Sequence, residues 1–217
     1  MCCGKRSGPQ LLMAKSNEIR VLLVRTGQTE WDQAGRLCGA TDVPLSQPGK
    51  QAAVDQAAGV VGTELSTVFC APDEASMATA AEVARATGAK VKAVAGLTEV
   101  SLGLWEGLLE TELEDKCPRL YRQWVEDPAS VQVPEGEGLE VARQRIMDHM
   151  TKALARSRNG AVGVVLRPVA HALVGCEFAG TPSRNVWSMM KTGPSLQWRT
   201  ILRDALRPTR EKARAGT

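Results

Sequence analysis

The sequence predicts a single α/β domain, a three-layer sandwich in which helices cover both faces of a mostly parallel sheet. Short apolar runs typical of buried strands alternate with longer helical patterns along the whole chain. A length of 217 residues, with 43% hydrophobic and 24% charged residues, is enough for one domain with a sizeable core. We expect that domain at residues 18–203, between a flexible N-terminal segment, 1–17, and a basic C-terminal tail, 204–217.

Strands are predicted at residues 19–24, 67–71, 90–97, 161–166 and 196–202. The first is an almost uninterrupted apolar run with no face suited to water, so we expect it to be central rather than at an edge or in a hairpin. Helices are predicted at 46–61, from Asp73 to Gly88, over 111–125 in two pieces broken at Pro118, at 139–154 and at 168–174.

Composition and charge exclude several classes of function. A formal net charge of +3 is too small to indicate a nucleic acid or a membrane as partner. The six cysteines are scattered, which favours the reducing cytoplasm over a disulfide framework. No apolar run is long enough for a signal peptide or a membrane span. No spacing of cysteines and histidines indicates a metal site, and we expect no cofactor.

Ligands of open α/β sheets bind at the carboxyl ends of the strands, which are predicted here at Arg25-Thr-Gly27, Cys70-Ala-Pro72, Leu97-Thr-Glu99 and Leu166-Arg-Pro168. Five segments at these ends and in the following loops carry recognisable motifs: Val24–Ser46, Cys70-Ala-Pro72, Leu97-Thr-Glu99, Gly103-Leu-Trp-Glu-Gly107 and Pro134-Glu-Gly-Glu137. In this order they resemble the histidine phosphatase superfamily, the phosphoglycerate mutase-like proteins, over roughly residues 19–180. The resemblance implies the fold of that family.

The same resemblance implies that key catalytic positions have changed. In the family a histidine after the first strand carries the phosphoryl group, and here that position is Thr26. The second histidine falls on Leu166 or Arg167, depending on the alignment. A helical arginine is replaced by Ala75 and a motif asparagine by Asp32, and both changes weaken binding of a phosphate dianion. A threonine hydroxyl without a base beside it is a poor nucleophile.

Other family positions are retained. Glu99 matches the family's acid and is the candidate acid here, with Thr26 as the degenerate nucleophile position. Two interpretations of the basic residues remain open: Arg25, Arg36 and Arg167 form a residual anion site, or Arg25 pairs with Asp32 or Glu99 and closes the pocket. We favour the second. The family-equivalent binding pocket comprises Arg25, Gly27, Thr29, Asp32, Arg36, Ala75, Leu166 and Arg167.

Few side chains could take over the roles of the two missing histidines. His171 is the only conceivable replacement base, and His149 is expected to pack on its helix. Cys38 and Cys70 are interpreted as small apolar residues, since no cationic partner that would activate either thiol can be named. The aromatic residues expected to anchor the core and loops rather than to frame a ligand are Trp31, Trp105 and Trp124.

Three classes of function follow. The favoured hypothesis is a family member that is catalytically inactive or impaired, a pseudophosphatase that binds a small anion or a protein partner. The alternatives are an active phosphomonoesterase or phosphoglycerate mutase-like enzyme with unorthodox residues, and a purely structural interaction module. The sequence leaves the ligand and the oligomeric state open.

Overall fold

A five-stranded mixed sheet forms the centre of the computed structural model, which describes residues 17–157 and 160–206. The strands are β1 (Glu18–Arg25), β2 (Leu65–Cys70), β3 (Lys90–Ala93), β4 (Ala161–Leu166) and β5 (Leu196–Leu202), in the order β3-β2-β4-β1-β5. Four strands run parallel, and β5 runs antiparallel beside β1. This agrees with the mostly parallel sheet that the sequence predicts.

The first strand lies inside the sheet, as its apolar run requires. β1 pairs with β4 on one side and with β5 on the other, so both of its edges are hydrogen-bonded. Its residues Val21 to Val24 are completely buried. The middle position belongs to β4, one strand away, and β1 forms no hairpin because β5 comes from the far end of the chain.

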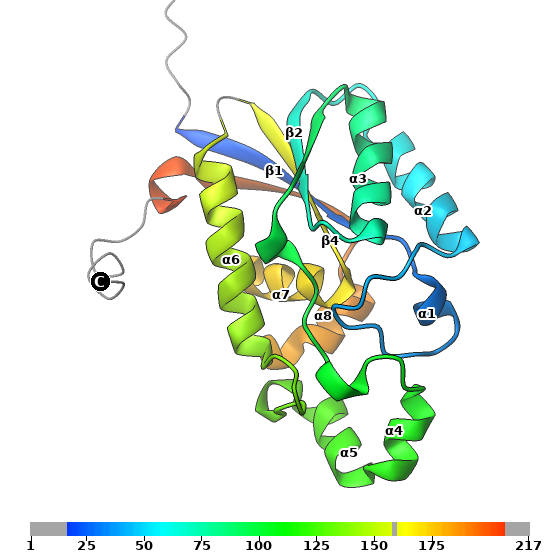
Figure 1. Ribbon diagram of the computed structural model, residues 1–217. Coiled ribbons are helices and arrows are strands. Elements are labelled where there is room, and N and C mark those ends of the chain that lie inside the picture. Colours follow the sequence, from blue (N-terminus) through cyan, green and yellow to red (C-terminus); the bar gives the residue numbers. More distant parts are fainter. Residues whose placement is uncertain (1–16, 158–159, 207–217) are drawn as a thin grey trace, which may run out of the picture.

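Helices cover both faces of this sheet, which makes the predicted three layers (Figure 1). One face carries α2 (Gln47–Ala58) and α3 (Glu74–Thr87), and the other carries α6 (Leu139–Ala155) and α7 (Pro168–Ala179), with α8 (Val186–Thr192) packed on α7. Figure 1 shows α1 (Glu30–Gln33) close to α2, and the pair α4 (Glu110–Lys116) and α5 (Pro118–Glu126) at the lower end of the molecule.

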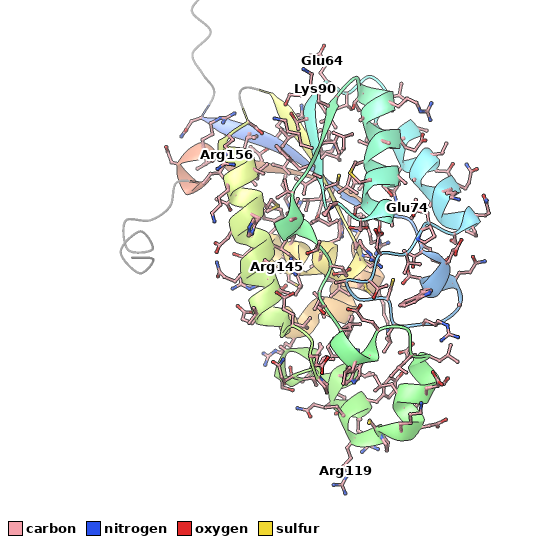
Figure 2. All side chains as sticks on the ribbon, viewed as in Figure 1. Glu64, Glu74, Lys90, Arg119, Arg145 and Arg156 are labelled. Carbon is pink, nitrogen blue, oxygen red and sulfur yellow. The ribbon has the colours of Figure 1, made fainter. Side chains whose placement is uncertain are left out.

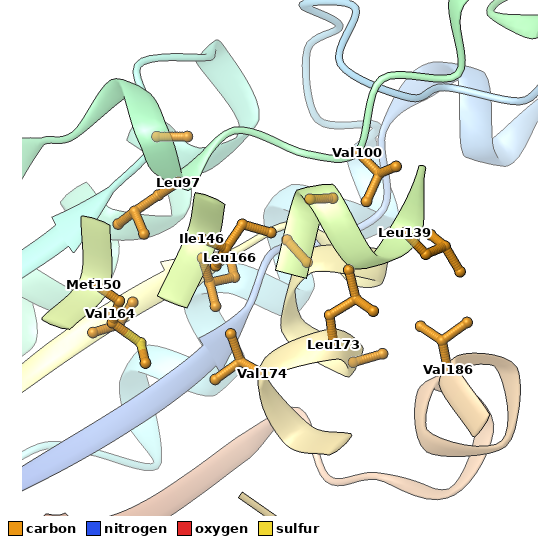
Figure 3. Packing of buried hydrophobic residues seen from close by; sticks show 14 of the residues in the cluster. Leu97, Val100, Leu139, Ile146, Met150, Val164, Leu166, Leu173, Val174 and Val186 are labelled. Carbon is orange, nitrogen blue, oxygen red and sulfur yellow. The ribbon is translucent and has the colours of Figure 1, made fainter. Parts of the chain in front are cut away.

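The core divides between these two faces according to the alternation of side chains along the strands. Val21 and Leu23 pack on the face covered by α6 and α7, whereas Leu22 and Val24 pack on the face covered by α3. On β4, Leu166 belongs to the first face and lies among core residues of α6 and α7 (Figure 3). Its side chain is completely buried.

The structure differs from the predicted elements at several points. The strand expected at 90–97 ends at Ala93, and residues 95–97 form a 3₁₀ turn. α1 and α8 are not predicted, since both are short and carry little periodicity. Of the flanking segments 1–17 and 204–217, residues 1–16 and 207–217 lie outside the described residues, so the domain boundaries stay a prediction.

No helix in the described part of the chain combines the length and the apolar composition that spanning a membrane would need.

Candidate functional site

The carboxyl ends of β1 and β4 meet directly, and the candidate site lies there. The backbone N–H of Thr26 donates to the carbonyl of Leu166 at 2.9 Å, which ties the loop after β1 to the end of β4. Gly27 then passes so close to α2 that a Cβ on it would lie 2.1 Å from the carbonyl oxygen of Gly49. Only glycine permits this approach, which fixes the path of the loop.

Thr26, at the predicted nucleophile position, has no base beside it. Its side chain is 5% exposed, and its Oγ1 is buried without a hydrogen-bond partner. His171, the conceivable substitute base, is also 5% exposed, and its Nε2 is likewise without a partner, so no hydrogen bond links it to Thr26 Oγ1. Burial and the charge of Arg25 lower the pKa of His171 from 6.5 to about 4, which makes it a weak base at neutral pH.

Arg167, not Leu166, presents a polar side chain at the end of β4. Leu166 points into the core, whereas Arg167 is the N-cap residue of α7 and lines a cavity. The Arg167 side chain is buried, with Nη1 donating to the carbonyl of Thr41 at 2.9 Å and Nη2 donating to Cys38 Sγ at 2.7 Å. Burial opposes the charge of Arg167, but Glu99, Cys38 and other neighbours more than offset it and raise the pKa above its ordinary value.

This contact corrects the expectation that Cys38 has no cationic partner. Arg167 lies 129 residues away in sequence, just after β4, and no local pattern around Cys38 indicates this contact. Burial nevertheless raises the pKa of the Cys38 thiol, even though Arg167 and Thr29 oppose the shift. Cys70 is completely buried next to the sulfur of Met77, as expected for an apolar filler. Neither cysteine is an activated thiolate.

Glu99 caps a helix at this site. Its Oε1 accepts hydrogen bonds from the backbone N–H groups of Val100 and Ala170, and its Oε2 accepts one from Val169, each at 2.8 Å. Two of these donors belong to the first turn of α7, where a carboxylate is favoured by the helix dipole. Burial raises the pKa of Glu99, opposed by Arg167 and by the three backbone donors. Both oxygens of Glu99 therefore accept hydrogen bonds from the backbone.

Arg25 does not pair with a carboxylate, so the expected closure by Asp32 or Glu99 is wrong. Arg25 Nη1 donates to the carbonyl of Met190 at 2.7 Å, and none of the ion pairs formed by the described residues includes Arg25. Asp32 instead accepts from the backbone N–H and the hydroxyl of Thr29 in the capping box of α1. Backbone donors next in sequence reach these carboxylates more readily than a distant guanidinium does.

Because Ala75 stands where the family has an arginine, this position at the start of α3 supplies no cation to the site. It is completely buried and packs with Leu45 and Ala53. The residue that the sequence interpretation overlooks here is Asp73, the N-cap of α3, whose Oδ2 is buried without a partner and whose charge acts on Arg167. Asp73 can be found in the sequence as a cap but not as a neighbour of Arg167.

A cavity of about 570 Å³ opens beside these groups. Of the residues that the sequence places in the site, Asp32, Arg36, Glu99 and Arg167 line it. The other members of the predicted site do not: Arg25, Thr26, Gly27, Thr29, Ala75 and Leu166. The nucleophile position is therefore set back from the cavity, and the charged residues that line it are three cations and three carboxylates: Arg36, Arg167, Lys191, Asp32, Glu99 and Glu110.

Sequence reasoning misses the residues that build the cavity wall and hold Glu99. Trp187 and Lys191 of α8 line the cavity, and nothing in their sequence context indicates it. Arg145, on the predicted helix 139–154, donates to the carbonyls of Gly96, Thr98 and Glu99 and pairs with Glu137, and so fixes the segment that carries Glu99. In Figure 2, Arg145 lies within the molecule, whereas Arg119 extends outward from the lower end.

The remaining predicted candidates have structural roles. His149 packs against Gly96, where a Cβ would lie 2.1 Å from its ring, and its Nδ1 contacts the carbonyl of Arg145 at 2.9 Å. Trp124 makes edge contacts with the buried Trp105 and with Trp187, at centroid distances of 5.5 and 4.9 Å. Trp124 is both a core anchor and part of the cavity lining.

Comparison with known proteins agrees with the motifs. The model of the histidine phosphatase superfamily (branch 1) matches residues 21–207. Phosphoserine phosphatase 1 of Hydrogenobacter thermophilus is 30% identical over 170 residues, which cover 78% of this chain and 81% of the relative. Probable phosphoglycerate mutase GpmB of Escherichia coli is 27% identical over 159 residues, 73% of this chain and 72% of the relative. Among solved structures, YhfR of Bacillus stearothermophilus has a TM-score of 0.74 at 24% identity, covering 78% of this chain and 84% of that one.

Proposed function

The chain belongs to the histidine phosphatase superfamily, and from that premise we propose that it is a pseudophosphatase: a member that transfers no phosphoryl group and uses the cavity beside Arg167 for binding. The observation that carries this proposal is the environment of the Thr26 hydroxyl. This hydroxyl is buried, has no base within hydrogen-bond distance and does not reach the cavity. A hydroxyl nucleophile needs both a base and access to its substrate.

The charges around the site support the same conclusion. Transfer of a phosphoryl group needs several donors aimed at its oxygens. Here both Nη atoms of Arg167 already donate to Thr41 and Cys38, and Ala75 supplies no charge. The carboxylates of Asp32 and Glu99 line the cavity and oppose a phosphate dianion.

Cys38 is an alternative nucleophile, since it contacts Arg167 and lines the cavity. A thiolate attacks phosphorus only in its deprotonated form, and burial raises the pKa of Cys38. Thiol-based transfer would also need a free acid for the leaving oxygen, while both oxygens of Glu99 accept backbone hydrogen bonds. The names of the relatives, a phosphoserine phosphatase and a probable phosphoglycerate mutase, fix the substrates to test.

The test measures hydrolysis of phosphoserine and p-nitrophenyl phosphate and the mutation of 3-phosphoglycerate. Wild type, Thr26→Ala and Cys38→Ala are compared, with the Hydrogenobacter relative as positive control. We expect no turnover above background in any form of this chain. The double variant Thr26→His/Arg167→His is also expected to stay inactive, because Ala75 and Asp32 still leave the phosphoryl group poorly neutralised. Turnover by the wild type that disappears with Thr26→Ala or Cys38→Ala would overturn the proposal.

A further inference from the structure

The cavity has one wall made of apolar and aromatic side chains. Val100, Leu102, Trp124 and Trp187 line it, and its volume of about 570 Å³ lies within the range of small-molecule sites. Such a wall favours a ligand with a flat apolar body, since aromatic rings bury large areas and prefer edge or offset contacts with other rings.

This wall is held in place before any ligand binds. Trp187 Nε1 donates to the carbonyl of Trp124 at 2.7 Å, and the two rings meet edge to face. α8, which carries Trp187, is tied to the end of β1 by the hydrogen bond from Arg25 to the carbonyl of Met190. A wall fixed in this way binds without the entropic cost of ordering mobile side chains.

The polar side chains around the cavity differ in how many of their hydrogen-bonding atoms already have partners within the chain. Each acidic side chain on its wall accepts hydrogen bonds from the chain itself: Asp32 from Thr29, Glu99 from three backbone N–H groups, and Glu110 from the hydroxyl of Tyr121. Each of these carboxylates is thus at least partly satisfied within the chain.

The cationic side chains that line the cavity keep hydrogen-bond donors without a partner. Lys191 is exposed and makes no hydrogen bond or ion pair with any residue that the structure describes. Arg36 donates from Nη1 to the carbonyl of Gly107 at 2.6 Å, and its other nitrogens find no acceptor among the described side chains and backbone. The cavity therefore presents positively charged donors that are not yet paired, which suits an anionic group.

We propose that this cavity binds an arylalkanoate, a monocarboxylate with an aromatic body, with its ring against Trp187 and its carboxylate held by Lys191 and Arg36. A single negative charge in this cavity meets less repulsion from Asp32 and Glu99 than a phosphate dianion would. The inference rests on the proposed function, because it gives the cavity a ligand that is not phosphorylated.

The test is isothermal titration calorimetry of the full chain with indole-3-propionate, its neutral amide indole-3-propionamide, and inorganic phosphate. Lys191→Met removes the charge and keeps an extended side chain, while Lys191→Arg restores the charge. Lys152→Met is the matched control, since Lys152 is likewise an exposed lysine in the last turn of its helix, α6, and does not line the cavity.

We expect the carboxylate to bind the wild type, the amide and phosphate to bind at least about tenfold more weakly, and Lys191→Met to lose about fivefold to tenfold in affinity. Lys191→Arg and Lys152→Met should bind as the wild type does. Equal binding of acid and amide, tighter binding of phosphate, equal effects of Lys191→Met and Lys152→Met, or no binding of the acid would each overturn the inference. Phosphoester turnover, measured separately, bears on the proposed function alone.

Discussion

His171 gives the protein a stability that depends on pH between about 7.5 and 4. The ring is 5% exposed, and burial together with Arg25 lowers its pKa from 6.5 to about 4. The folded protein therefore keeps His171 neutral in a pH range where the unfolded chain protonates it. Stability from this group is fully present above pH 6.5 and is lost as the pH falls toward 4, since the unfolded state binds more protons.

The size of the effect follows from the two pKa values. Each unit of pH between them changes the free energy of unfolding by about 1.4 kcal/mol. Lowering the pH from 7.5 to 5 should thus remove about 2 kcal/mol through His171 alone. The assay is urea unfolding at pH 7.5, 6.5, 5.5 and 5.0, with His171→Leu as the comparison. Leucine removes the titrating group, and it abandons no hydrogen bond at Nε2, which has no partner.

The difference in stability between wild type and His171→Leu should shift by about 2 kcal/mol in favour of the variant over this pH range. All other ionisable groups are present in both proteins, so their contributions cancel. Parallel pH profiles for the two proteins would refute the reasoning, because they would mean that His171 has the same proton affinity folded and unfolded. Such a result would also mean that His171 keeps the ordinary basicity of a histidine.

Three other substitutions test the site and the core by urea unfolding. Glu99→Gln should destabilise by about 2 to 4 kcal/mol, because one backbone N–H of the α7 cap loses its acceptor and Arg167 loses a compensating charge; a cost under 0.5 kcal/mol, the size of an ordinary surface change, would contradict the capping role. Gly27→Ala should cost about 2 kcal/mol or more, since its Cβ would lie 2.1 Å from the Gly49 carbonyl oxygen, and a neutral result would mean that the loop moves freely. Leu173→Ala, at a completely buried core position (Figure 3), should cost about 3 kcal/mol, and a loss below 1 kcal/mol would show that α7 is loosely packed.

The sequence predicts the sheet well because a buried strand can be recognised locally, by its run of apolar residues. The almost uninterrupted apolar run of β1 indicates a strand inside a covered sheet, and the structure buries it there. β3 is shorter than predicted, since the alternating pattern of 90–97 continues into a 3₁₀ turn that buries Leu97. α8 has no such local signal, because it is short and its position depends on packing against α7.

The candidate site is less predictable, because its chemistry depends on contacts between distant segments. The family motifs locate Thr26, Glu99 and Arg167 at strand ends, but they do not show which partners those side chains take. The sequence interpretation pairs Arg25 with a carboxylate, whereas the structure gives it the carbonyl of Met190. The carboxylates of Asp32 and Glu99 accept hydrogen bonds from helix N-termini instead, because those donors lie close by, either next in sequence or at the adjacent strand end.

The most direct test of the central claim is the intact mass of the protein after incubation with phosphoserine or p-nitrophenyl phosphate and rapid quenching. A phosphoenzyme would appear as a species heavier by one phosphoryl group. The Hydrogenobacter phosphoserine phosphatase is measured in parallel for comparison. The account predicts that the mass of this chain stays unchanged with both substrates. A phosphorylated species that is lost in Thr26→Ala or Cys38→Ala would contradict it.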